Sequence, residues 1–262
     1  MRLRPHREVT RSHDAMPALA LLAGGLATRL GTVARHVPKS LVVVAGRPFV
    51  AHQLRALAEQ GVTDVVICCG HLGAMIEDFV GDGGRFGCRV RYSHDGSVLL
   101  GTGGAIRKAL PLLGEQFWVM YGDSYLRVDF SAVMAAFETS EKAALMTIHC
   151  NQDRWDASNV EFAGGRVVRY AKRGHDDCAG AMRHIDYGLG LYKAETFREW
   201  PAGAVFDLAA VQTELAARGE MAGYEVRERF YEIGSPAGLR EADAFLRSQR
   251  AIASEILSGV NA

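Results

Sequence analysis

Residues 16–25 read MPALALLAGG, a short apolar run that ends in a pair of glycines. Such a run, bounded by a turn signal, is typical of a fully buried β-strand. The run is too short for a membrane span, which needs about 20 apolar residues. Arg2, Arg4, Arg7 and Arg11 precede it and give the start some likeness to a signal peptide. The strand reading fits better, because the apolar run merges into a polar, glycine-rich segment.

Beyond this first strand, short apolar runs alternate with amphipathic stretches of helical length. The expected strands cover residues 18–23, 64–69, 88–93, 117–121 and 143–150, and the expected helices cover 49–60, 72–80, 102–110, 130–138, 206–218 and 236–248. This rhythm predicts an α/β fold with a doubly wound, Rossmann-like sheet that is mixed but mainly parallel. Three more strands between residues 158 and 192 indicate a meander added to that sheet.

The chain shows no linker or repeat that would divide it. We expect a disordered extension over residues 1–15, a single domain over 16–250 and a tail over 251–262. In a doubly wound sheet, ligands bind beyond the carboxyl ends of the strands. The loops that follow strands are therefore the places to look for function.

Composition excludes several classes of protein. The 262 residues carry 30 basic and 30 acidic side chains, so no broad cationic surface is expected for nucleic acid or a membrane. The five cysteines show no Cys-x-x-Cys spacing, which disfavours a disulfide framework and favours the cytoplasm. An anionic ligand would have to be bound by a local site.

The loop after the first strand has the composition of such a site. Gly24 and Gly25 let backbone amides approach phosphate oxygens, and Arg29 and Lys39 supply positive charge. The spacing fits neither a Walker A loop nor the G-x-G-x-x-G fingerprint of dehydrogenases. A tight turn with solvated charges would also explain these residues.

The segment AGGLATRL at residues 23–30, followed by Pro38 and Lys39, resembles the signature of sugar-1-phosphate nucleotidyltransferases. That signature is roughly G-G-x-G-T-R-L-x(8,9)-P-K-P, from which Ala27 and Ser40 depart. The resemblance implies the fold of nucleotide-diphospho-sugar transferases, an NTP and a sugar 1-phosphate as substrates, Mg²⁺ as cofactor and a homodimer. It also implies catalytic roles for Arg29, Lys39 and Asp123.

The resemblance extends to other segments of the chain. LGTGGAI at residues 100–106 is similar to the family segment that lies against the nucleobase and ribose, where glycines including Gly104 permit close approach. The implied nucleotide-binding residues are Ala23, Gly24, Gly25, Thr28, Asp95, Gly101, Thr102 and Gly103.

Two carboxylates are implied as magnesium ligands. Asp123 in YGDSY (121–125) resembles the family's strand-end aspartate, and Glu232 in YEIGSP (231–236) falls where the family usually has the aspartate of D-x-G-T. Oxygen donors suit this hard cation. Each residue also has an ordinary explanation, as a turn or cap residue at the end of a strand.

Residues of the second substrate site are implied by weaker matches. Lys172 falls at the lysine of a Glu-Lys-Pro segment, with Ala171 and Arg173 replacing its neighbours. The implied ligands of the sugar phosphate are Asn159, Lys172, Asp186 and Gly188.

Two further groups have chemistry-bearing side chains. His175, Asp176, Asp177 and Cys178, with His184 downstream, contain residue types that bind zinc. Cys68 and Cys69 are neighbours on an expected strand, so their side chains point to opposite faces and are expected to be buried thiols.

Several functions remain open at this point. The small size and the GTGGAI stretch resemble those of heptose-1-phosphate guanylyltransferases and of N-acetylmuramate-1-phosphate uridylyltransferases. We expect the heptose type, with uridylyltransferases for N-acetylmuramate or hexose 1-phosphate as the alternative. A cytidylyltransferase for a phosphorylated alcohol and a nucleotide-sensing regulatory subunit would share the fold. A nicotinamide oxidoreductase would need the glycine fingerprint that is missing.

Overall fold

The computed structural model describes residues 16–25, 37–151, 154, 157–171 and 182–259, and the side chains only as far as residue 251. The predicted extension over 1–15 lies outside these ranges, as do Thr28, Arg29 and Lys172. None of the helices in the described ranges is both long enough and apolar enough to cross a bilayer.

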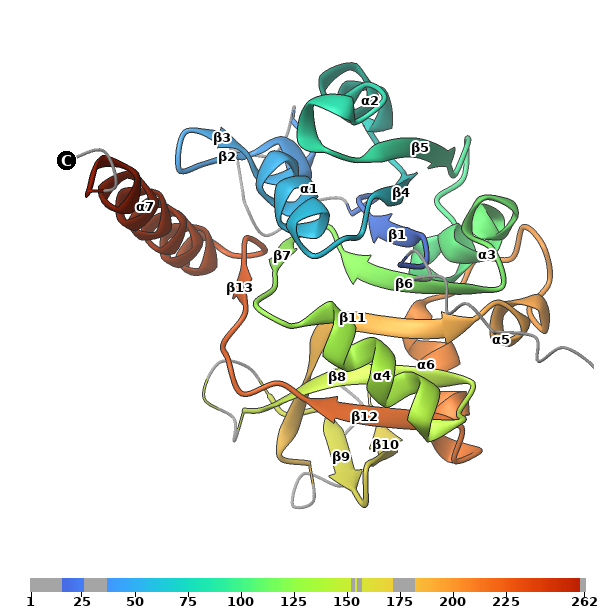
Figure 1. Ribbon diagram of the computed structural model, residues 1–262. Helices are drawn as coiled ribbons and strands as arrows, with labels where there is room; N and C mark the ends of the chain where they lie inside the picture. Colours follow the sequence, from blue (N-terminus) through green and yellow to red (C-terminus); the bar gives the residue numbers. More distant parts are fainter. Residues whose placement is uncertain (1–15, 26–36, 152–153, 155–156, 172–181, 260–262) are drawn as a thin grey trace, which may run out of the picture.

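The first half of the chain forms four parallel strands in the order β5-β4-β1-β6 (Figure 1). These strands are β1 (Leu19–Leu22), β4 (Asp64–Cys69), β5 (Arg89–His94) and β6 (Gln116–Tyr121). The helices α1 (Phe49–Glu59), α2 (Gly73–Val80) and α3 (Gly101–Leu113) connect them. The predicted βαβ pattern is confirmed here, with element ends that differ by three residues or fewer.

The second half adds five strands to the same sheet. They are β8 (Ala144–Cys150), β9 (Val160–Ala163), β10 (Arg166–Tyr170), β11 (His184–Lys193) and β12 (Met221–Glu225). The order continues from β6 as β11-β8-β12-β10-β9, with β11 antiparallel to both of its main neighbours.

This arrangement corrects two expectations. The sheet is mixed, but only half of its eight neighbouring strand pairs are parallel, so "mainly parallel" was wrong for the described residues. The expected meander is split, because β9 and β10 form a hairpin at the edge while β11 lies in the middle of the sheet. The strand β12 was not predicted at all.

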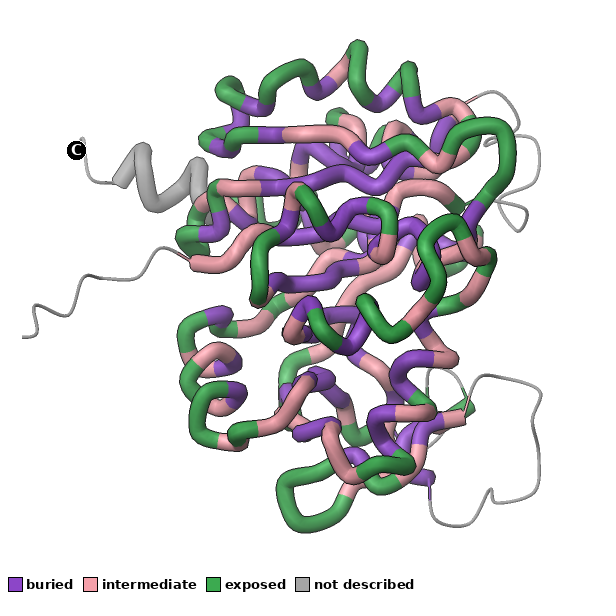
Figure 2. Tube along the Cα trace, turned by 90° about the vertical axis from the view of Figure 1, so that its right-hand side faces the viewer, coloured by how far each residue is buried: buried purple, intermediate pink, exposed green. Residues whose placement is uncertain are grey.

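Helices cover both faces of the sheet, as a doubly wound fold requires. The apolar residues of α1, α2 and α4 (Phe130–Ser140) pack on one face, and those of α3, α5 (Glu195–Arg198) and α6 (Leu208–Ala217) pack on the other. Figure 2 shows the buried strands between more exposed helices. Asp129 begins α4 by accepting a hydrogen bond from the amide of Ala132 at 3.1 Å.

Smaller elements lie beside the sheet. A short hairpin pairs β2 (Val43–Val44) with β3 (Arg47–Pro48). The distant strands β7 (Ser124–Tyr125) and β13 (Tyr231–Glu232) form a separate antiparallel pair, and 3₁₀ turns cover Lys39–Leu41 and Gly84–Phe86. The last helix, α7 (Pro236–Gly259), packs its first turns on a separate apolar cluster around Phe49 and Ile233. It continues well beyond the predicted end at residue 248, into the segment expected to be a tail.

Candidate functional site

A cavity of about 420 Å³ lies at the carboxyl ends of β1, β4 and β6. Because parallel strands share this edge, the loops that follow them converge there. Its lining includes eight residues expected at the site: Ala23, Gly24, Gly25, Lys39, Asp95, Gly101, Thr102 and Asp123. The structure therefore brings these eight residues together around one cavity, and their role in binding a nucleotide stays a prediction.

A second cavity, of about 670 Å³, adjoins the first one. It is lined by Asn159, Asp186 and Glu232 together with Tyr121 and Asp123, which line the first cavity as well. The two cavities thus share a wall at the end of β6. That wall is where a reaction between two bound ligands would take place.

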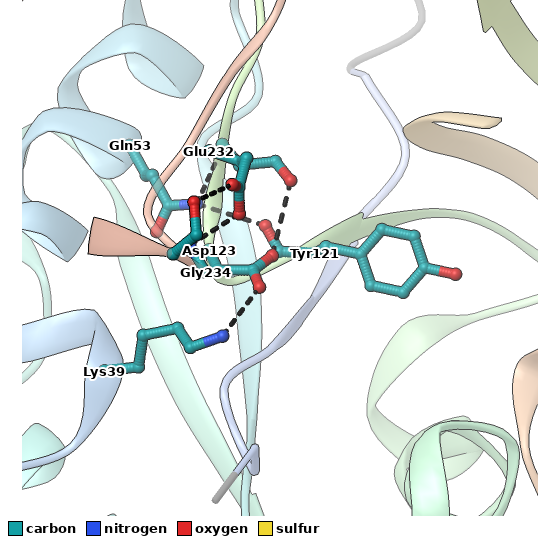
Figure 3. A network of polar contacts seen from close by, with 8 residues as sticks. Lys39, Gln53, Tyr121, Asp123, Glu232 and Gly234 are labelled. Atoms are coloured by element: carbon teal, nitrogen blue, oxygen red, sulfur yellow. Dashed lines mark hydrogen bonds and ion pairs between the residues drawn. The ribbon is translucent and has the colours of Figure 1, made fainter. Parts of the chain in front are cut away.

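Asp123 occupies this shared wall because β6 turns sharply after Tyr121. The amide of Gly122 donates to the carbonyl of Leu22 at 3.0 Å, which ties the turn to the end of β1. The Asp123 carboxylate accepts a hydrogen bond from the ammonium of Lys39 at 3.0 Å (Figure 3). Both side chains are mostly shielded from solvent, so this ion pair is less screened than one at the surface.

Glu232 reaches the same place from the other end of the chain. β13 pairs with β7 so that Glu232 lies opposite Ser124, and the amide of Ile233 donates to the Asp123 carbonyl at 2.9 Å. The Glu232 carboxylate accepts hydrogen bonds from the Gly234 amide at 2.5 Å and from the Ser235 hydroxyl at 3.0 Å. A side chain far from Asp123 in sequence is thereby fixed beside it.

The two carboxylates have the chemistry of a magnesium site. A Cβ atom added to Gly234 would lie against the Glu232 carboxylate and 3.6 Å from Oδ2 of Asp123, so the two groups flank one point. Mg²⁺ prefers oxygen ligands and is commonly held by one or two carboxylates together with substrate phosphates. The residues present fit that cation.

Gln53 holds the turn from the opposite side and was missed in the sequence. Its side-chain amide donates to the carbonyls of Tyr121 at 3.2 Å and Ser124 at 2.8 Å, the residues that enclose the Asp123 turn (Figure 3). Gln53 is completely buried within α1. A polar residue among the apolar positions of that helix is the one signal that could have revealed it.

Asp95 follows β5 and contributes a carboxylate to the 420 Å³ cavity. One of its oxygens accepts a hydrogen bond from the Leu100 amide at 3.1 Å, at the start of α3. Burial raises the pKa of Asp95 from its usual value, and the Leu100 amide opposes that shift.

Two of the glycines at the start of α3, Gly103 and Gly104, pack against the chain at Phe206. The amides of Gly103 and Gly104 donate to the carbonyl of Phe206 at 3.0 and 3.1 Å, and a Cβ at Gly103 would collide with the Phe206 ring. Gly101 and Thr102 line the cavity, whereas Gly103 packs against the chain at Phe206. We therefore assign Gly103 to packing rather than to ligand contact.

Asp186 lies at the base of the 670 Å³ cavity. The Gly188 amide donates to its carboxylate at 2.9 Å and the Gln212 side chain donates at 3.3 Å. Burial raises the pKa of Asp186 to about 6. Asn159 lies beside it and accepts a hydrogen bond from the Asp186 amide at 3.1 Å.

The remaining candidates are two cysteines on β4, of which Cys68 also lines the 420 Å³ cavity, and residues that the structure does not describe. Burial raises the pKa of Cys68 and raises that of Cys69 to about 12, so both are buried thiols as expected. The segment 175–178, considered for zinc, lies outside the described residues, as do Thr28, Arg29 and Lys172. A larger cavity of about 760 Å³ between α1, α7 and residues 125–130 contains none of the expected site residues.

Comparison with known proteins fits this geometry. The family model described as nucleotidyl transferase matches residues 19–159, which include β1, Lys39, Asp95 and Asp123. The chain belongs to the nucleotidyl transferase family. The resemblance drawn from the glycine-rich signature is thereby confirmed, and every residue that lines the 420 Å³ cavity except Asp207 lies within the matched segment.

Individual relatives agree with the family assignment. The chain is 32% identical over 227 residues to the N-acetylmuramate alpha-1-phosphate uridylyltransferase of Neisseria meningitidis, covering 86% of this chain and 96% of that protein. It is 28% identical to the D-glycero-alpha-D-manno-heptose 1-phosphate guanylyltransferase of Campylobacter jejuni, over 54% of this chain and 62% of that one. The crystal structure of HddC from Yersinia pseudotuberculosis has the same fold, with a TM-score of 0.71 at 21% identity over 88% of this chain and all of that one.

Proposed function

We propose that this nucleotidyltransferase transfers a nucleoside monophosphate from an NTP to a sugar 1-phosphate, which yields an NDP-sugar and pyrophosphate. The observation that carries the proposal is the shared wall between the two cavities, where Asp123 meets both Lys39 and the Glu232 turn. An NTP in the smaller cavity and a sugar phosphate in the larger one would meet there.

The reaction needs no covalent intermediate with the protein. An oxygen of the sugar 1-phosphate attacks the α-phosphorus, a new P–O bond forms, and the bond to the departing pyrophosphate breaks with its electron pair. Both substrates are anions, so the protein has to align them and neutralise their charge. The loop at Gly24 and Gly25 offers backbone amides to the phosphates, and Lys39, with Arg29, would stabilise the charge that develops on pyrophosphate.

Asp123 and Glu232 are the residues that would hold Mg²⁺, and Asp123 is the catalytic one because it also borders the nucleotide cavity. The cation would neutralise phosphate charge during the displacement. Glu232 is longer than the aspartate usual in the family. Its hydrogen bonds to Gly234 and Ser235 keep its carboxylate folded back toward its own turn, which offsets the extra methylene.

The sugar would lie against Asn159 and Asp186 in the larger cavity, and Gly188, which does not line that cavity, would position the Asp186 carboxylate through its backbone amide. Carboxylate and amide groups at fixed positions suit the hydroxyl groups of a sugar. We assign the phosphate of this substrate to Lys172, on the resemblance alone.

Uridylyl transfer to N-acetylmuramate 1-phosphate is the first substrate pair to test, because the uridylyltransferase relative matches at 32% identity over 96% of its length. Guanylyl transfer to a heptose 1-phosphate, favoured by the sequence motifs, is the second, with a relative at 28% identity over 62% of its length. Asp95 does not choose between them, since a carboxylate accepts hydrogen bonds from the ring N–H of either base.

The test measures Mg²⁺-dependent pyrophosphate release with each of four NTPs against hexose, N-acetylhexosamine, muramic and heptose 1-phosphates. We expect one productive pair, with UTP and N-acetylmuramate 1-phosphate the first candidate. Release with phosphocholine and CTP instead would support the cytidylyltransferase alternative. Nucleotide binding without pyrophosphate release in the presence of any acceptor would contradict the proposed reaction and favour a regulatory subunit.

A further inference from the structure

Three side chains outside the proposed active site meet at the carboxyl ends of β8 and β12. They are Cys150 at the end of β8, His184 at the start of β11 and Glu225 at the end of β12. One ligand atom from each lies within 4.8 Å of the other two, and Nε2 of His184 is 4.0 Å from a carboxylate oxygen of Glu225. The reaction proposed above uses none of the three.

The strand register itself brings these residues together. His184 is the direct cross-strand partner of Cys150, and Glu225 is the partner of Ile148 on the other side of β8. Side chains alternate between the faces of a strand, so Ile148 and Cys150 share a face. All three chemistry-bearing side chains therefore project from the same face, over one end of β8.

The neighbouring residues hold the histidine in position. The ring of Phe162 packs edge to face against His184, with 5.4 Å between the ring centroids, and only 14% of the His184 side chain is exposed. His149 is not a fourth member of the group. It points to the opposite face, where it bonds to the Val226 carbonyl at 2.9 Å.

We infer that Cys150, His184 and Glu225 form a second metal site, suited to Zn²⁺ rather than Mg²⁺. A thiolate, an imidazole and a carboxylate are a typical zinc donor set, and water would complete a tetrahedron. The donors of a tetrahedral zinc site lie about 3.3–3.8 Å apart, given bonds of about 2.0–2.3 Å. The present donor atoms lie within 4.8 Å of one another, so a bound ion would draw them closer, and the Glu225 side chain, 44% exposed, has room to move.

Zinc at this position would clamp three strands beside the sugar cavity. The backbone amide of Asn159 donates to the His184 carbonyl at 2.9 Å, and the side-chain oxygen of Asn159 accepts a hydrogen bond from the Asp186 backbone amide. Asp186 follows His184 by two residues, so both side chains lie on the same face of β11. Fixing His184 therefore fixes the start of the strand that carries Asp186 and Gly188. The site would stabilise the wall of that cavity without touching the reacting atoms.

Cobalt substitution tests the site directly in the full-length chain. Co²⁺ replaces Zn²⁺ in such sites and gives a thiolate charge-transfer absorption that oxygen-only sites do not give. We expect one equivalent of Co²⁺ to produce this band and Zn²⁺ to displace it. Cys150→Ser should abolish the band, and His184→Ala and Glu225→Gln should weaken binding by about tenfold or more. Zinc should raise the melting temperature of the unmodified chain and leave that of Cys150→Ser unchanged.

Two control variants make the result specific. Asp123→Ala should keep the cobalt band, because the proposed magnesium site is separate, and Cys178→Ser should keep it as well. A band lost in Cys178→Ser but kept in Cys150→Ser would overturn the assignment. Absence of any band from the folded, unmodified chain at saturating Co²⁺ would overturn it too, whatever the outcome of the pyrophosphate assay.

Discussion

The ammonium of Lys39 lies 3.0 Å from the carboxylate of Asp123, although 84 residues separate them in the chain. Each group comes from a loop at the carboxyl edge of the sheet, and each lines the 420 Å³ cavity. The pair neutralises two charges that would otherwise be partly buried alone. When an NTP and its cation bind, Lys39 would contact a phosphate and Asp123 would contact the metal, instead of each other.

Replacing Asp123 with alanine should leave the fold intact and lower turnover by about 10² or more, the scale for loss of one electrostatic stabiliser. Steady-state pyrophosphate release and circular dichroism check the two halves of this expectation. Asp129→Asn is the matched control, because asparagine also begins helices well and Asp129 lies outside both cavities. Turnover near normal in Asp123→Ala would remove Asp123 from the metal site.

Glu232→Ala should raise the Mg²⁺ concentration needed for half-maximal turnover by about tenfold or more, because one of two proposed metal ligands is lost. A magnesium titration at saturating substrates measures it. Glu228→Gln, an exposed partner of Arg127 just before β13, should leave the titration unchanged. An unchanged midpoint in Glu232→Ala would assign Glu232 to the turn at Gly234 and Ser235 alone.

Gln53→Leu should destabilise the protein by about 1–3 kcal/mol, because the carbonyls of Tyr121 and Ser124 lose their buried donor. Turnover should fall about tenfold even where the variant is fully folded, since the Asp123 turn loses its support. Urea unfolding and pyrophosphate release provide the two measurements. The exposed Gln249→Leu should change stability by less than about 0.5 kcal/mol. If Gln53→Leu lost stability but kept full turnover, the support of the turn would be irrelevant to the reaction.

The sequence predicts features that depend on neighbouring residues better than features that depend on contacts between distant parts of the chain. The strand over residues 64–69 was predicted to the residue, because Asp64 is followed by the continuous apolar run VVICC. The strand β12 was missed because MAGYE is short, contains Gly223 and lacks a clear alternation. No local pattern indicates that β11 enters the middle of the sheet, since that placement depends on pairing with β6 and β8.

The same limit applies to the candidate site. Lys39 and Asp123 were predicted from motifs, because each belongs to a recognisable segment, and both line the 420 Å³ cavity together with Asp95. Gln53 was missed because its function depends on carbonyl groups about 70 residues away. The packing of Gly103 against Phe206 was not predicted, since this contact cannot be read from a glycine-rich stretch.

Two glycine variants separate packing from ligand binding. Gly103→Ala should destabilise the protein by about 1–3 kcal/mol, because its Cβ would meet the Phe206 ring and the backbone of Asp207. Gly25→Ala should leave stability nearly unchanged, because no residue that the structure describes lies within 4 Å of the added Cβ, and should raise the KM for the NTP. Thermal unfolding and NTP titrations distinguish them. The reverse pattern would place Gly25 in the packing and Gly103 at the ligand.

Asp186→Asn should change how stability depends on pH. Burial raises the pKa of Asp186 to about 6, whereas an unfolded aspartate titrates near 4. Between these values the folded state binds more protons than the unfolded state, so this carboxyl makes stability fall as pH rises from about 4 to 6, by up to about 3 kcal/mol. Asparagine does not titrate, so the variant lacks this pH dependence. If the side-chain amide of Gln212 turns by 180°, its oxygen, which has no hydrogen-bond partner among the described residues of the unmodified chain, can accept a hydrogen bond from the new asparagine NH₂ group. Urea unfolding should therefore show the variant gaining stability over the unmodified chain across this window, while Asp129→Asn shows no such gain. A constant difference between the two proteins from pH 4 to 7 would mean that Asp186 ionises normally in the folded state.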